Sequence, residues 1–238
     1  MKLDGKTALI TGGTKGIGYG VAEAMIHQGM KVAITGRTQA TVNDAVNALN
    51  NIKSGYCIGI AADVRNFEEQ QQAVDAVMDE WGQLDVLIAN AGLGHFAKIG
   101  DLTPDQWNET IDVNLTGVFY SIKASLEALK ASKGYIITIA SLAGTNFFAG
   151  GAAYNASKFG LVGFTQAVML DVRQDDIKVS TIMPGSVATY FNDHVPNEKD
   201  AWKIQSEDIG QIVVDLLKMP ARTLPSKVEV RPSKPPTR

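Results

Sequence analysis

The chain has 238 residues, of which 45% are hydrophobic and 20% are charged, a composition typical of one globular domain with a sizeable core. Its 22 basic and 25 acidic residues give a net charge of −3, so there is no electrostatic basis for a nucleic-acid or anionic-membrane partner. The single cysteine, Cys57, excludes an intramolecular disulfide framework and lies in an apolar run, which predicts a buried, inert thiol.

No apolar stretch reaches the roughly 18 residues needed to span a bilayer, and the N-terminal residues do not resemble a signal peptide. We therefore expect a cytoplasmic protein that does not enter a membrane. His27 and His194 have no ligand-spaced carboxylate or cysteine partners, so no metal site is expected.

Short apolar runs alternate with longer segments of helical spacing along the chain. The expected strands are residues 7–10, 31–35, 56–61, 86–89, 135–140, 178–183 and 227–230. The expected helices are residues 18–28, 38–50, 67–81, 104–129, 151–171 and 207–217. This alternation predicts βαβ units, and therefore an α/β fold with a doubly wound parallel sheet of about seven strands and helices on both faces.

No linker or internal repeat interrupts this pattern, so we expect a single domain over residues 1–230. Residues 231–238 are proline-rich and basic, and we expect them to form a poorly ordered tail rather than a docking motif.

A glycine-rich segment follows the first expected strand and leads into a helix. Glycines allow the backbone to turn tightly and to approach a pyrophosphate, whose charge then faces the free N–H groups at the start of the helix. The first gap between the glycines is one residue longer than in the common dinucleotide fingerprint. The segment predicts a dinucleotide site whose candidate residues are Gly12, Thr14, Lys15, Gly16, Ile17 and Gly18.

The end of the second expected strand favours NADP(H) over NAD. Enzymes of this architecture that use NAD usually have an acidic residue there, and this chain has Arg37. Arg37 is suited to grip a 2′-phosphate, and Lys15 adds a second positive charge. The alternative is that both are solvated surface cations. After the third strand, Asp63 is expected to accept a hydrogen bond from adenine next to Val64, or else to cap the next helix.

Tyr154 and Lys158 are four residues apart, and Ser141 lies thirteen residues before the tyrosine. In a helix, Tyr154 and Lys158 share one face. A phenol has an ordinary pKa of about 10, and a neighbouring ammonium in a partly dry cleft lowers it toward neutrality. The pair therefore predicts a proton donor and acceptor, although a Tyr-x3-Lys spacing taken alone is more often a surface pair on an amphipathic helix.

Together these motifs resemble the short-chain dehydrogenase/reductase family. The residues that carry the resemblance stand in order over about residues 5–190: Thr11-Gly12-x3-Gly16-x-Gly18, Asn90-Ala91-Gly92, Asn114, Ser141, Tyr154-x3-Lys158 and Pro184-Gly185. The resemblance implies a single Rossmann-type domain, carbonyl/alcohol chemistry with NAD(P), and a homodimer or homotetramer.

It also implies a role for each catalytic residue. Tyr154 would exchange a proton with the substrate oxygen, and Ser141 would bind and orient the same oxygen. Lys158 would lower the pKa of Tyr154 and hold the nicotinamide ribose. Asn114 would anchor a water that relays protons to Lys158.

The remaining implied contacts concern the cofactor and the substrate. Asn90, Ala91 and Gly92 would border the adenosine and ribose, and the segment after the sixth strand would hold the carboxamide through Pro184, Gly185, Val187 and Thr189. A short lid at about residues 186–206 suggests an open pocket. Its expected lining is His95, Phe147 and Tyr190, and Phe148, Phe191 and Trp202 are further candidates for an apolar wall. The alternatives are that His95 is an ordinary loop histidine, which is favoured, and that the rings are ordinary packing.

The resulting hypothesis is an NADPH-dependent oxidoreductase that reduces a small-molecule ketone or aldehyde to an alcohol. An alternative in the same class is a 3-oxoacyl-thioester reductase acting on an acyl-carrier-protein or CoA ester. A third hypothesis, from a different class, is a non-catalytic NADP-binding regulator, against which the intact Ser141, Tyr154 and Lys158 argue.

Overall fold

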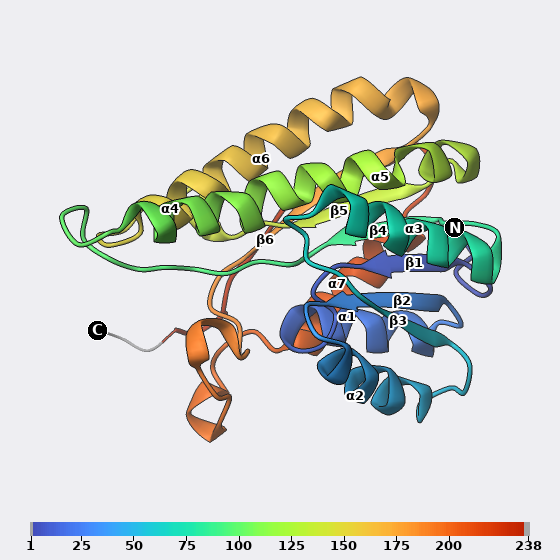
Figure 1. Ribbon diagram of the computed structural model, residues 1–238, viewed down its shortest axis with the longest axis horizontal. Coiled ribbons are helices and arrows are strands. Elements are labelled where there is room, and N and C mark those ends of the chain that lie inside the picture. The colour runs from blue at the N-terminus through green and yellow to red at the C-terminus, as the bar shows by residue number, and fades with distance from the viewer. Residues whose placement is uncertain (1, 236–238) are drawn as a thin grey trace.

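The computed structural model describes residues 2–235. Across these residues, seven strands form one sheet in the order β3-β2-β1-β4-β5-β6-β7, and all neighbours are parallel (Figure 1). The strands are β1 (Thr7–Ile10), β2 (Lys31–Gly36), β3 (Cys57–Ala61), β4 (Val86–Ala89), β5 (Tyr135–Ile139), β6 (Lys178–Pro184) and β7 (Lys227–Val230).

Helices cover both faces of the sheet. One face carries α1 (Gly16–His27), α2 (Gln39–Asn50) and α7 (Ser206–Lys218). The other carries α3 (Phe67–Trp81), α4 (Pro104–Ile111), α5 (Gly117–Ser132) and α6 (Ala152–Val172). Two apolar cores, one on each face, fill the space between sheet and helices. This confirms the predicted α/β class, the doubly wound parallel sheet and its seven strands.

The predicted strands agree with the structure to within one residue at each end. The expected helix at residues 104–129 differs, because a π-helical turn, Asp112–Thr116, separates α4 from α5. Such a turn inserts one residue into a helix and is frequent at functional sites. Hydrophobic periodicity does not reveal it, because the apolar pattern continues through the insertion.

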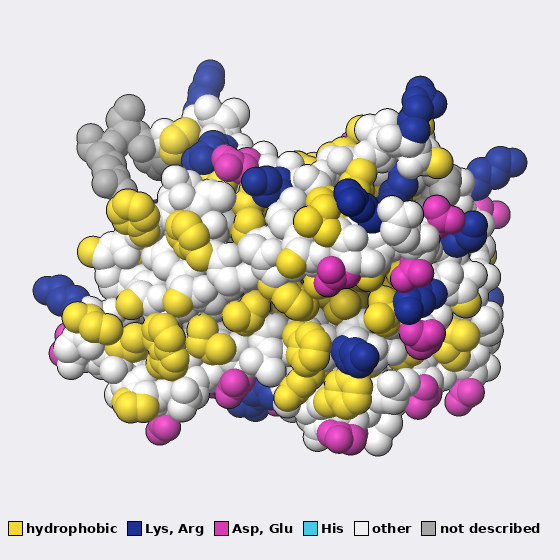
Figure 2. All heavy atoms as spheres, turned by 90° about the horizontal axis from the view of Figure 1, so that it is seen from above, with side chains coloured by type: hydrophobic (Ala, Val, Ile, Leu, Met, Phe, Trp, Pro, Cys, Tyr) yellow, Lys and Arg dark blue, Asp and Glu magenta, His cyan; other side chains and the backbone are white. Residues whose placement is uncertain are grey.

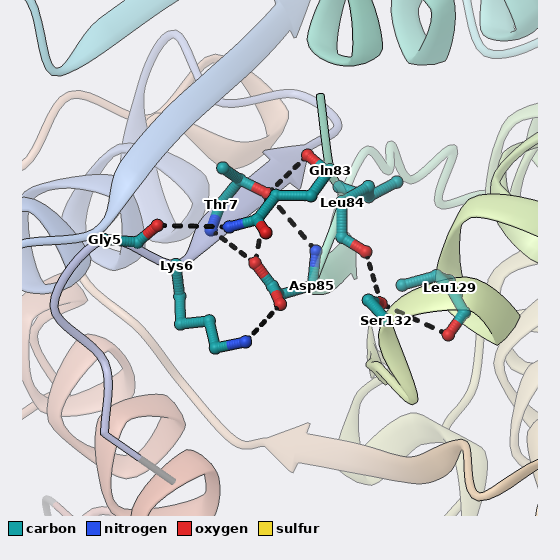
Figure 3. A network of polar contacts seen from close by, with 8 residues as sticks. All are labelled: Gly5, Lys6, Thr7, Gln83, Leu84, Asp85, Leu129 and Ser132. Carbon is teal, nitrogen blue, oxygen red and sulfur yellow. Dashed lines mark hydrogen bonds and ion pairs between the residues drawn. The ribbon is translucent and has the colours of Figure 1, made fainter. Parts of the chain in front are cut away.

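A buried carboxylate ties the first and fourth strands together at the amino edge of the sheet (Figure 3). Asp85, 2% exposed, accepts hydrogen bonds from the Thr7 backbone N–H at 2.9 Å and from Lys6 Nζ at 2.7 Å. The Thr7 hydroxyl donates to the Gln83 carbonyl at 2.7 Å. These contacts fix the register of β1 against β4, the two strands at which the strand order reverses.

The opposite, carboxyl edge is where ligands bind in open α/β sheets, next to the point of reversal. In Figure 1 the loop after β4 and the segment between β6 and α7 both extend on this side. The expected division at residue 230 stays a prediction, and residues 236–238 of the expected tail lie outside the described part of the chain. No helix within residues 2–235 is long and apolar enough to cross a membrane.

Candidate active site

The glycine turn between β1 and α1 has the geometry of an anion site. Gly12 and Gly16 have φ of 64° and 59°, the left-handed region that favours glycine. A Cβ on Gly18 would lie 2.5 Å from the Gly12 carbonyl oxygen, so the turn closes onto the helix only with glycine there. At the start of α1, Lys15 makes no side-chain cap and the first turn has no acidic residue. The first N–H groups of the helix are therefore left for a ligand such as a pyrophosphate.

The end of β4 fastens this turn. Asn90 Nδ2 donates to the carbonyls of Thr11 and Gly12 at 2.9 and 3.0 Å, and the Thr11 hydroxyl accepts from the N–H groups of Asn90 and Ala91. Asn90 was predicted to border the adenosine and ribose. The structure shows that its amide holds the shape of the glycine turn.

A cavity of about 880 Å³ runs along the carboxyl edge of the sheet. Most of the predicted site residues line it: Gly12, Thr14, Lys15, Gly16, Ile17, Arg37, Asp63, Val64, Asn90, Ala91, Gly92, His95, Tyr154, Lys158, Thr189 and Tyr190. The remaining predicted residues are not among its lining: Gly18, Asn114, Ser141, Phe147, Pro184, Gly185 and Val187. Among the described residues, no group of three or more His, Cys, Asp or Glu is placed to hold a metal ion.

At the β2–β3 end of the cavity, Arg37 is exposed directly after β2. Asp63, after β3, is paired with Arg65, whose Nη2 lies 2.6 Å from Asp63 Oδ2. Hydrogen bonding from Arg65 lowers the pKa of the Asp63 carboxyl below its usual value. The suggestion that Asp63 caps the next helix is wrong, because Asn66 caps α3 by accepting from the Glu69 N–H. The adenine contact of Asp63 stays a prediction.

Arg65 extends this ion pair toward the loop after β4. Its Nη1 lies 3.7 Å from Glu109 Oε1, and the other oxygen of Glu109 lies 2.8 Å from His95 Nε2. His95 therefore lines the cavity as part of a surface ion network. Among the described residues, His95 has no hydrogen bond or ion pair with Tyr154, which agrees with an ordinary loop histidine.

Ser141 and Tyr154 meet at the middle of the carboxyl edge. Ser141 follows β5, and its hydroxyl accepts from the Ala143 N–H at 3.1 Å. Tyr154 stands in the first turn of α6. The Ser141 hydroxyl hydrogen-bonds the phenol of Tyr154. Two polar groups therefore face one point, as is required to bind and protonate one substrate oxygen.

Burial raises the pKa of the Tyr154 phenol, and the hydrogen bond from Ser141 offsets this in part. This is opposite to the expected lowering toward neutrality. Lys158 is 4% exposed, and burial lowers its pKa to about 8. Its Nζ donates to the Ile139 carbonyl at 3.1 Å and lies 5.7 Å from the centre of the Tyr154 ring. Burial is therefore the dominant influence on the pKa of the Tyr154 phenol.

Asn114 stands in the π-helical turn and is fully buried. Its Oδ1 accepts from the Leu93 N–H at 2.9 Å, and its Nδ2 donates to the Leu93 carbonyl at 2.8 Å and to Ser157 Oγ at 3.0 Å. The side chain therefore clamps the loop after β4 to α6. A Cβ on Gly92 would lie 3.3 Å from Asn114 Oδ1 and 3.6 Å from Lys158 Nζ, which places the three residues side by side.

Aromatic rings surround Tyr154. The centre of the Phe96 ring lies 5.4 Å from that of Tyr154, and the Phe191 ring lies 5.7 Å from it. Phe148 joins this cluster through Phe96 at 5.8 Å. The expected wall residue Phe147 does not join it, because its side chain is 87% exposed. The ring that this loop contributes is that of Phe148.

The segment after β6 returns to the glycine turn. A Cβ on Gly16 would lie 3.4 Å from Thr189, and the Lys15 ammonium lies 5.7 Å from the centre of the Tyr190 ring. Val187 pairs with Ile204 across the lid. Within the lid, Asp200 binds Lys203 and His194, each at 2.6 Å, which closes the segment on itself.

Comparison with known proteins identifies the family. A family model described as short chain dehydrogenase matches residues 6–200. The chain is a short-chain dehydrogenase. It is 36% identical over 197 residues to a 3-oxoacyl-[acyl-carrier-protein] reductase of Synechocystis, which covers 82% of the chain and 80% of the relative.

Two solved structures resemble this short-chain dehydrogenase over nearly its full length. A metagenomic short-chain oxidoreductase in complex with NADP has 31% identity and a TM-score of 0.85, and the match covers 98% of this chain and all of the other. An alcohol dehydrogenase of the archaeon Thermococcus sibiricus, complexed with 5-hydroxy-NADP, has 27% identity and a TM-score of 0.88, covering 98% and 99%. Membership confirms the resemblance inferred from the motifs, and the chain is an oxidoreductase of this family.

Three residues that shape the site were missed in the sequence. Arg65 carried no motif, although a cation two residues after an aspartate is a candidate ion pair. Phe96 follows the Asn90-Ala91-Gly92 segment closely enough to be suspected. Asn155, inside the Tyr154-x3-Lys158 motif, donates from Nδ2 to the carbonyls of Ala143 and Asn146 at 2.7 and 2.8 Å. No sequence signal separates this role from that of a surface asparagine.

Proposed function

We propose that the protein is an NADPH-dependent carbonyl reductase, which converts a ketone or aldehyde to an alcohol. The observation that carries this proposal is that Tyr154 and Lys158 line the same cavity as the glycine turn, while Ser141 hydrogen-bonds Tyr154. A non-catalytic protein that only binds the dinucleotide would need the glycine turn, but it would not need the buried Lys158 beside the phenol of Tyr154. Burying an ammonium costs stability, so its presence favours the catalytic hypothesis over the non-catalytic regulator.

Some residues of the chain would bind the cofactor, and others would transfer a proton to the substrate. When bound, NADPH would supply the hydride that adds to the carbonyl carbon and would leave as NADP. Tyr154 would give its proton to the oxygen as negative charge develops there, and Ser141 would donate a second hydrogen bond to the same oxygen. The Lys158 ammonium would bind the nicotinamide ribose and stabilise the phenolate once the proton has left.

The preference for NADPH rests on charge at the β2 end of the cavity. Arg37 is exposed there, and no acidic residue stands at the end of β2 to hold a free ribose hydroxyl. Charge-assisted hydrogen bonds are worth about 1.5–3 kcal/mol each, so Arg37 alone would favour a 2′-phosphate by roughly ten- to hundredfold. The NADP-type ligands in the two similar structures support the same choice.

A second candidate is reduction of a 3-oxoacyl thioester. The 36% identical relative from Synechocystis favours it, because that protein is a 3-oxoacyl-[acyl-carrier-protein] reductase. The two candidates share the catalytic residues and the cofactor, so they differ only in the substrate.

The deciding experiment follows absorbance at 340 nm with NADPH and, in parallel, NADH, against ketones, aldehydes and an acetoacetyl thioester. We expect turnover with NADPH, its loss in Tyr154→Phe with NADPH binding retained, and a reversed cofactor preference in Arg37→Asp. Turnover by Tyr154→Phe at the wild-type rate would refute the assignment. The preferred substrate separates the two candidates.

The outer face of α4, α5 and α6 exposes large hydrophobic side chains, which bears on the quaternary structure. Trp107, Phe119, Phe159 and Leu170 are each 40–53% exposed on it, and Figure 2 shows hydrophobic side chains gathered over this face. We infer that it is covered by a second copy in a homodimer or homotetramer. Light scattering of Phe159→Glu against the wild type tests this: the variant should be smaller. A cytoplasmic location stays a prediction.

A further inference from the structure

Two phenylalanines pack against Tyr154, Phe96 and Phe191, and a third, Phe148, joins them through Phe96. Phe96 comes from the loop after β4, Phe148 from the loop before α6, and Phe191 from the lid after β6. Their ring centres are 5.8 Å apart for Phe96 and Phe148 and 6.3 Å apart for Phe96 and Phe191. Interplanar angles of 54–60° are those of tilted and edge-to-face packing.

The cluster is held in place by the backbone. The Ala97 N–H donates to the Gly150 carbonyl at 2.9 Å, which joins the loop of Phe96 to the loop of Phe148. Asn155 Oδ1 accepts from the Phe148 N–H at 3.4 Å, while its Nδ2 holds the preceding residues. The rings are therefore positioned before any ligand arrives, which limits the entropy that a ligand must lose.

The three rings remain 37–47% exposed, although Phe96 and Phe191 lie against the candidate catalytic tyrosine. An apolar surface of this kind is usually covered in the working state. A flat aromatic group would extend the edge-to-face packing and bury the exposed carbon. A carboxylate would instead lose its hydration against three phenyl rings without gaining a partner.

The arginines of the cavity are remote from this surface, whereas Lys15 comes within 5.7 Å of the ring centre of Tyr190, the residue before Phe191. Arg37 and Arg65 follow β2 and β3, on the far side of the glycine turn from β5 and Tyr154. Lys158 is committed to the Ile139 carbonyl at 3.1 Å. With NADPH bound, Lys15 would face the phosphates of the cofactor at the glycine turn, so an anionic substrate would have to compete with the cofactor for it.

We propose that Phe96, Phe148 and Phe191 form an aryl-binding site, so that the substrates are aryl ketones and aryl aldehydes whose carbonyl oxygen rests on Tyr154 and Ser141. The reduction of these substrates rests on the proposed function, whereas the binding of an aryl group by the three rings does not. It names the substrate class, and it disfavours small 3-oxo acids.

Two matched substrates and one anionic substrate test it. Acetophenone and cyclohexyl methyl ketone have the same carbon skeleton and differ in aromaticity, and acetoacetate carries a charge. We expect kcat/KM with NADPH to be highest for acetophenone. Phe96→Ala should lower it roughly three- to tenfold for acetophenone, the effect of one aromatic pair, and less than about twofold for acetoacetate. Phe147→Ala, on the exposed neighbour of Phe148, is the control and should change neither.

A binding measurement separates this inference from the proposed function. In Tyr154→Phe loaded with NADPH, acetophenone is titrated while the nicotinamide fluorescence is followed. If no carbonyl is turned over but Phe96→Ala and Phe148→Leu weaken acetophenone binding, the reductase proposal fails and the aryl site stands. Equal affinity for acetophenone and acetoacetate, or equal losses for both in Phe96→Ala and Phe148→Leu, would overturn the aryl site.

Discussion

Replacing Lys158 by methionine should stabilise the cofactor-free protein. Burial lowers the pKa of this lysine from 10.5 to about 8, so folding opposes its charged form. A difference of about 2.5 pH units at 1.36 kcal/mol each corresponds to about 3 kcal/mol at pH 7. The substitution also removes the hydrogen bond to Ile139, worth about 1 kcal/mol. The expected net gain in free energy of unfolding is about 2 kcal/mol.

The stability difference between Lys158→Met and the wild type should depend on pH, in a direction set by the lowered pKa of Lys158. A lysine whose folded pKa is lowered destabilises the protein below that pKa, and the penalty disappears as the pH rises toward the unfolded value. The advantage of Lys158→Met over the wild type should therefore shrink by about 2 kcal/mol between pH 7 and pH 9.5.

Urea unfolding of the cofactor-free protein at both pH values measures the gain. Lys123→Met, on the exposed side of α5, is the control and should show neither gain nor pH dependence. NADPH should stabilise the wild type more than Lys158→Met, because the ammonium is retained for the ribose. A Lys158→Met protein that is less stable than the wild type at pH 7 would refute the reasoning.

Three further predictions concern the frame of the site. Asp85→Ala leaves the buried Thr7 N–H without its acceptor and should lower the unfolding free energy by about 2–4 kcal/mol in urea, while NADPH affinity of the folded fraction is unchanged. Gly18→Ala should weaken NADPH binding at least tenfold by fluorescence titration, because its Cβ collides with the Gly12 carbonyl; wild-type affinity would contradict the close approach. The pKa of Asp200 is held well below its usual range by hydrogen bonds from Lys203 and His194, so the lid contacts persist above about pH 4 and are lost only below it. Limited proteolysis of the lid should accordingly be as slow at pH 5 as at pH 8 in the wild type and faster at both in Asp200→Ala, and equal rates in the two proteins would argue against this role.

The sequence predicted the strands, the helix ends and the glycine turn because each is determined by residues close together in the sequence. Strands buried on both faces read as continuous apolar runs. The capping box at Thr103 and the left-handed Gly82 lie next to the helix ends expected at residues 104 and 81. The glycine turn carries its constraint in its own residues, because Gly12 and Gly16 need positive φ. The strand bounds were accordingly predicted almost to the residue.

What the sequence could not predict depends on tertiary contacts between loops. The sign of the Tyr154 pKa shift is set by burial of the phenol, which depends on how the loops pack around it and which spacing does not reveal. The choice of Phe148 over Phe147 depends on the conformation of one loop, in which Phe147 is exposed and Phe148 packs against Phe96. The π-helical turn at Asn114 escapes notice because it adds one residue without breaking the apolar pattern.

Phe96, Phe148 and Phe191 all come from connections between elements of the sheet, and this affects how such an enzyme can evolve. Each ring lies in a connection that contributes no strand to the sheet, whereas the register of β1 and β4 is secured by Asp85 at the opposite edge. Mutations that retune the pocket are therefore decoupled from those that endanger folding. A lineage with this layout can drift among substrates at little risk to its stability, and a library randomised at Phe96, Phe148 and Phe191 should retain folded protein in most of its members.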